Sequence, residues 1–112
     1  MKISSKKSGR VFVIQFSGDL MGDIEDVNAF KNLIFEAIED DLVNFVVDLK
    51  QVNWMNSSGL GMLISGLTTA RSSGGDLKLA NVSDRNRRPL ELTRLDSVFS
   101  IYDSIEEAVT SF

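Results

Sequence analysis

The chain has 112 residues, and its mixture of 43% hydrophobic and 25% charged residues fits one folded domain rather than a disordered chain. It contains no cysteine and no histidine, which excludes disulfides, His/Cys metal ligation, Ser-His-Asp triads and Cys-His dyads. The formal net charge of −4 argues against a nucleic-acid backbone as the main partner.

The first half of the chain is expected to form a hairpin, a helix and a buried strand. Residues 11–17 are rich in β-branched and aromatic residues, which predicts a strand. Residues 2–6 could pair with it as a short edge strand through the turn at 7–9. Apolar residues at helical spacing over 24–40 predict an amphipathic helix. Residues 43–49 are almost continuously apolar, as is typical of a strand covered on both faces.

The second half is expected to alternate helices with short strands. A helix opens within residues 56–60, and the glycines at 74 and 75 suit its end, where a left-handed residue is common. Residues 81–88 are expected to form a polar, arginine-rich connection. The other predicted elements are a strand over 76–80, a short helix over 90–95, a strand over 98–101 and a last helix from Ser104 to Thr110, with a capping box at Ser104 and Glu107.

This alternation of strands and helices predicts an α/β domain that occupies residues 1–112. The opening hairpin makes the sheet mixed, with four or five strands, and we expect four helices packed mainly on one face. The predicted core residues are Val11, Val13, Phe30, Ile34, Val46, Leu49, Leu60, Leu63, Leu67, Leu77, Leu79 and Leu95.

No motif for nucleotide binding or catalysis is complete. Gly59 and Gly61 begin like a dinucleotide fingerprint, but Ile64 stands where the third glycine belongs, and no P-loop follows. The acidic residues within 36–41 could hold Mg²⁺, although a solvated helix end explains them as well. We therefore predict no catalytic residue, no metal site and no cofactor, and hence no enzyme.

The most informative stretch is Asn56-Ser57-Ser58-Gly59-Leu60, which follows a buried strand and opens a helix. In open α/β sheets, ligands and partners bind at the carboxyl ends of the strands. A serine at this place could cap the helix by accepting a backbone N–H. Its hydroxyl could instead accept a phosphate, which the positive end of a helix tolerates. Two adjacent serines allow both roles, with one capping and one modified.

Five segments resemble the STAS domain family in sequence and in order. Residues 46–49 and 52–61 look like its signature, and residues 74–82 continue the likeness downstream. The turn at 16–20 and the closing segment at 95–102 resemble the family too. The resemblance spans nearly the whole chain and implies the STAS fold. Its best-known stand-alone members are bacterial anti-sigma factor antagonists.

The resemblance also implies a function, a pair of partners and a modified residue. Those antagonists are substrates of a serine kinase that doubles as the anti-sigma factor, and a PP2C-type phosphatase reverses the modification. The unphosphorylated form binds the kinase and frees the sigma factor. The acceptor serine of the family matches Ser57, while the residue before it, usually aspartate, is Asn56 here. This departure leaves room for a STAS protein that is docked to but not phosphorylated.

The expected docking face joins the first turn of the second helix to the loop at 18–22. Its predicted contact residues are Asn56, Ser57, Ser58, Gly59, Leu60, Met62, Asp19 and Met21. Trp54 and Met21 are candidates for exposed apolar contacts, but either could belong to the core. Arg85, Arg87 and Arg88 could pair with a phosphate or an acidic partner, or form a solvated basic loop.

The alternative function is a structural subunit of a larger assembly, such as a lipid-transport ABC system or a stress-sensing scaffold. In that role the serine would cap the helix and never be modified. No apolar run approaches the ~20 residues of a membrane span, and no apolar stretch follows the basic residues 1–7. We therefore expect a cytoplasmic domain with no membrane insertion. The sequence leaves its oligomeric state open.

Overall fold

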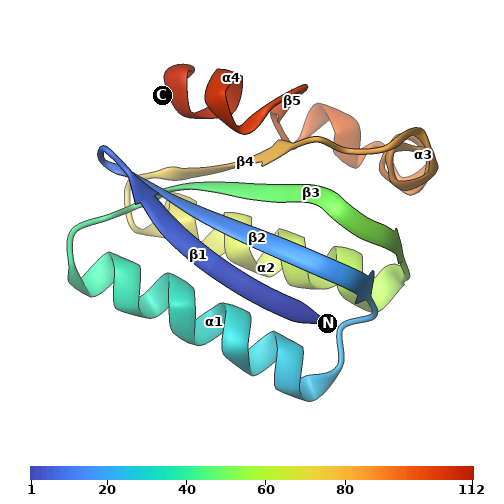
Figure 1. Ribbon diagram of the computed structural model, residues 1–112, viewed down its shortest axis with the longest axis horizontal. Coiled ribbons are helices and arrows are strands. Elements are labelled where there is room, and N and C mark those ends of the chain that lie inside the picture. The colour runs from blue at the N-terminus through green and yellow to red at the C-terminus, as the bar shows by residue number, and fades with distance from the viewer.

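A single five-stranded sheet organises residues 1–112, all of which are described by this computed structural model (Figure 1). The spatial order of the strands is the order of the chain, from β1 to β5. β1 runs antiparallel to β2, and every later pair is parallel, so the predicted mixed sheet is confirmed. The strands are β1 (Lys2–Ser8), β2 (Val11–Leu20), β3 (Asn44–Met55), β4 (Asp76–Ala80) and β5 (Ile101–Tyr102).

Four α-helices and one 3₁₀ turn connect or follow the strands. The helices are α1 (Ile24–Glu39), α2 (Ser57–Ser72), α3 (Asp84–Leu92) and α4 (Ile105–Thr110), and the turn covers Leu95–Ser97. The predicted α/β class is therefore confirmed. None of the helices is both long and apolar enough to cross a membrane.

Most of the helical cover lies on one face of the sheet, as expected, and the short α4 covers the other. Ile14 and Val47 belong to the larger core, under α1 and α2, whereas Val13 and Val46 pack with Ala108 of α4 on the opposite face. Figure 1 shows α1 and α2 on one side of the sheet and α4 on the other. The physical reason lies in β3, because its residues from 45 to 49 alternate between the two faces and are all buried.

Four boundaries differ from the predicted ones. β2 runs on to Leu20, so that of the loop expected at 18–22 only residues 21 and 22 lie outside a strand. β3 runs on to Met55, since Val52 and Met55 pair with the end of β2 across two register shifts. The arginine-rich stretch expected as a connection is the start of α3, because the hydroxyl of Ser83 accepts the N–H of Asn86 and caps a helix there. Val98, expected to begin a strand, is exposed and precedes β5.

The predicted core is buried except for Leu95, which lies half-buried in the 3₁₀ turn. The sheet also buries a carboxylate, that of Asp48 on β3. Its oxygens accept hydrogen bonds from the Asn81 amide at 2.8 Å, the Gln15 amide at 3.3 Å and the Lys50 N–H at 3.2 Å. Because buried charges need such partners, Asp48 joins β3 to β2 and to the residue that follows β4, and its role is in the fold.

Candidate functional site

The candidate site lies at the end of the sheet where β2 and β3 finish and α2 begins. Asn56 is the N-cap of α2: its side-chain oxygen accepts the N–H of Gly59 at 2.8 Å. Its own N–H donates to the carbonyl oxygen of Leu20 at 3.2 Å, which joins the cap to the end of β2. The helix is therefore capped by Asn56, and the expectation that one of the two serines caps it is wrong.

Both serines are consequently left free of the cap. Ser57 and Ser58 occupy the first two positions of α2, are exposed, and have side-chain hydroxyls with no hydrogen-bond partner in the protein. Their backbone N–H groups belong to the first turn, where a helix has no internal acceptor for them. The site therefore presents two hydroxyls beside unsatisfied N–H groups at the positive end of a helix dipole.

The loop between β2 and α1 packs directly on this turn, backbone against backbone. A Cβ atom added at Gly59 would lie 2.7 Å from the carbonyl carbon of Leu20. One added at Gly22 would lie 2.6 Å from the carbonyl carbon of Ser58, and Gly22 also has a φ of +70°. Both positions therefore need glycine. The structure thus brings the segment at 18–22, which is the end of β2 and the start of the loop after it, against the first turn of α2 as one surface.

The predicted contact residues divide into an exposed group and a buried group. Asn56, Ser57, Ser58 and Asp19 are exposed and Met21 is half-buried, whereas the buried residues are Gly59, Leu60 and Met62. Met62 is only 4% exposed, because it lies on the side of α2 that packs toward α1. The structure therefore corrects its place: Met62 supports the surface from within the core and does not present its side chain to a partner.

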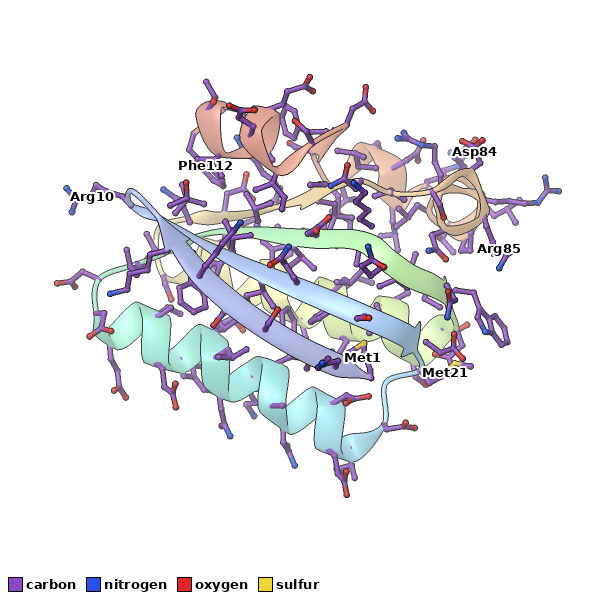
Figure 2. All side chains as sticks on the ribbon, viewed as in Figure 1. Met1, Arg10, Met21, Asp84, Arg85 and Phe112 are labelled. Atoms are coloured by element: carbon purple, nitrogen blue, oxygen red, sulfur yellow. The ribbon has the colours of Figure 1, made fainter.

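The sequence left open whether Trp54 is an exposed contact residue or part of the core. The structure shows it exposed, with 48% of its surface accessible. It borders a hollow with Arg85 and Pro89, and the Arg85 guanidinium donates to the carbonyl of Asn53 at 3.3 Å. Figure 2 places Arg85 and Met21 at the same end of the sheet. The arginines thus start a helix beside the site and do not form a free loop.

Leu92 is an apolar surface residue near the site that the sequence did not single out. It is 73% exposed at the end of α3 and lines a hollow that also reaches Ser57 and Leu60. The short helix expected over 90–95 contained both leucines, but α3 buries Leu90 and exposes Leu92. No group of three or more carboxylates converges anywhere in the structure as a metal site would require.

Comparisons with known proteins agree on one family. The sequence profile described as the STAS domain matches residues 2–108. A Thermotoga maritima protein with the provisional name anti-sigma factor antagonist is 35% identical over 89 residues, 78% of each chain. The anti-sigma F factor antagonist of Paenibacillus polymyxa is 26% identical over 111 residues, which cover 98% of this chain and 93% of that one.

Solved structures share the whole fold. A Thermotoga maritima crystal structure with the same provisional description has a TM-score of 0.85 and 28% identity, covering 97% of this chain and 92% of its own. A sulfate transporter family protein of Wolinella succinogenes has a TM-score of 0.79 at 19% identity, covering 93% and 85%. The fold also occurs outside the antagonists, so it does not identify one. The family assignment rests on the STAS profile, which spans nearly the whole chain. The protein belongs to the STAS domain family.

Proposed function

We propose that this protein is an anti-sigma factor antagonist that docks onto its anti-sigma factor through the first turn of α2 and the adjoining segment at 18–22. The names of its relatives support that role. The observation that carries the proposal is the free hydroxyl of Ser57, which stands exposed at a helix start already capped by Asn56. Because Ser57 does not cap the helix, its hydroxyl is available for modification.

The proposed switch is phosphorylation of Ser57 by an anti-sigma factor that is also a serine kinase. The Ser57 oxygen forms an ester bond to the γ-phosphorus of ATP, ADP leaves, and the hydroxyl proton passes to a base of the kinase. The product carries about −1.5 to −2 charges, which the helix dipole and the free N–H groups of the first turn favour. Asn56 is neutral and adds no repulsion.

Docking responds in the opposite way to the same charge. A partner packed over Ser57 and the segment at 18–22 would have to bury a hydrated phosphate without a matching cation, which costs several kcal/mol. A penalty of about 3 kcal/mol lowers affinity more than a hundredfold, since each 1.4 kcal/mol is a factor of ten. A PP2C-type phosphatase would restore the docking form. The protein itself supplies no catalysis in this cycle.

The rival function is a STAS subunit of a larger assembly that is never phosphorylated. One observation favours it, namely that Asn56 stands where the family usually has aspartate. The capping geometry does not distinguish the two functions, because asparagine and aspartate cap helices equally well. The two functions are distinguished only by whether a kinase phosphorylates Ser57.

The first test is therefore a phosphorylation assay with the cognate kinase and ATP, read by site-resolved mass spectrometry. We expect one phosphate per chain on Ser57, none on the Ser57→Ala variant, and normal modification of Ser58→Ala as the matched control. Phosphate found only on Ser58, or none at all with a kinase shown to be active, would contradict the proposal.

A further inference from the structure

A groove of about 320 Å³ runs between α1 and α2, on the side of both helices that faces away from the sheet. Phe30, Ile34 and Met62, which are all buried, form its apolar floor. Its volume is at the low end of the ~300–1,000 Å³ of small-molecule sites, whose walls are also mostly apolar. The groove meets the proposed docking surface at Ser58, which lines it, whereas Ser57 does not.

The groove exists because α2 presents small residues along it. Ser58, Gly61 and Ser65 follow one another at helical spacing, so Met62 at the floor is the only long side chain that α2 contributes to the lining. A Cβ atom added at Gly61 would meet no other atom within 4 Å. A side chain at this position would therefore begin in open space, which the glycine leaves free.

The shape of the groove favours a linear occupant. Its lining on α2 extends from Ser58 to Thr69, which is about 16 Å of helix at 1.5 Å per residue. On α1 the lining runs in parallel from Val27 to Phe35. An extended aliphatic chain matches the length of this lining along the two helices.

The charge of the groove favours an anion. Lys31 is the only charged residue in the lining, although the chain as a whole carries a net charge of −4. Its ammonium lies 5.7 Å from the centre of the Phe35 ring at the rim. The Ser58 end of the groove is also the positive end of the α2 dipole.

We propose that this groove binds a free medium-chain aliphatic carboxylic acid, with the chain on Phe30, Ile34 and Met62 and the carboxylate paired with Lys31. The apolar floor supplies burial of the chain, and the single cation at the rim selects an acid over an alcohol or an amine. This binding site adjoins the docking surface at Ser58 but does not include Ser57.

The test is a titration with decanoate, decanol and decylamine below their aggregation limits, followed by calorimetry and by amide NMR. Decanoate should bind saturably, one per chain, and shift the amide signals of Gly61 and Ser65. Decanol and decylamine should bind at least about tenfold more weakly, which corresponds to about 1.4 kcal/mol. Equal binding of decylamine, or no saturable binding of decanoate, would overturn the proposal.

Two variants locate the site. Gly61→Leu should lower decanoate affinity at least tenfold while melting no lower than the wild type, and Thr68→Leu, exposed on α2 outside the groove, should bind normally. Lys31→Gln should reduce decanoate to the affinity of decanol, whereas Lys50→Gln, an exposed lysine of β3, should not.

Three other outcomes for the Gly61→Leu variant also bear on whether the acid binds in this groove. A folded Gly61→Leu protein that binds decanoate normally would place the acid elsewhere. If sedimentation shows a wild-type dimer that Gly61→Leu disrupts, the occupant is a second copy of the chain and the proposal is wrong. Should Gly61→Leu fail to fold, Ser65→Leu, which projects into the same groove from an exposed position, takes its place.

Discussion

At the scale of single residues, the site depends on the different roles of Asn56, which caps α2, and Ser57, whose hydroxyl is free. The side-chain oxygen of Asn56 accepts the N–H of Gly59, so the hydroxyl of Ser57 is not needed to cap the helix. Aspartate at position 56 would cap the helix equally well, but would add a negative charge beside a phosphate on Ser57. The asparagine therefore keeps the geometry and removes the charge.

The cap can be tested through stability. We expect Asn56→Ala to lower the free energy of unfolding by about 1 kcal/mol, because the N–H of Gly59 loses its acceptor. Asn56→Asp should retain the wild-type value. Urea unfolding followed by circular dichroism measures both, with Asn53→Ala, an exposed asparagine of β3, as the control. A fully stable Asn56→Ala protein would show that the cap contributes nothing.

At the scale of elements, α4 depends on contacts beyond its own length. It has six residues, too few for a helix to be stable alone. The ammonium of Lys78 on β4 donates to the carbonyl and hydroxyl oxygens of Ser111, at 3.1 and 2.8 Å, and lies 4.1 Å from the centre of the Phe112 ring. A cation at the carboxyl end of a helix is favoured by the dipole. Lys78 therefore holds α4 on its face of the sheet.

Replacement of this lysine should loosen α4 and leave the rest of the fold intact. Lys78→Met keeps the length of the side chain but loses both hydrogen bonds, so the amides of residues 108–110 should exchange at least about tenfold faster, or ~1.4 kcal/mol. Hydrogen exchange by NMR gives this rate, and Lys50→Met serves as the exposed control. Unchanged exchange in α4 would mean that its apolar face alone holds it.

Most elements could be predicted from hydrophobic patterns, and the misplaced ones share a physical cause. α3 starts four residues after the end of β4, because Ser83 caps it and because the buried amide of Asn86 donates to the carbonyl of Val52 at 3.1 Å. A pattern of apolar residues does not reveal that a polar residue such as Asn86 is buried. β3 extends to Met55 through irregular pairing with β2, which the sequence of one strand does not contain.

The site was predictable in its location but not in its detail. The carboxyl ends of adjacent parallel strands meet at one edge, so the approach of the segment at 18–22 to α2 follows from the topology. Which residue caps α2 depends on the exact start of the helix, and asparagine and serine are equally good caps. The burial of Met62 and the exposure of Leu92 depend on the rotation of α2 and α3, which their neighbours decide.

At the scale of the whole molecule, the proposed switch lies at one end of a rigid frame. Gly22 and Gly59 allow the loop and α2 to touch through their backbones, and the cap of Asn56 closes the same corner. A phosphate on Ser57 would project outward from this corner into solvent, where Ser57 is exposed. The account therefore predicts that modification changes the docking surface and leaves the fold as it is.

The measurement that tests this claim most directly is calorimetric binding of the cognate anti-sigma factor to the wild type, Ser57→Ala and Ser57→Asp. Ser57→Ala should bind within about threefold of the wild type, whereas Ser57→Asp, with less charge than a phosphate, should bind at least about tenfold more weakly. Both variants should melt within a few degrees of the wild type. An Asp variant that is folded and binds like the wild type would contradict the account.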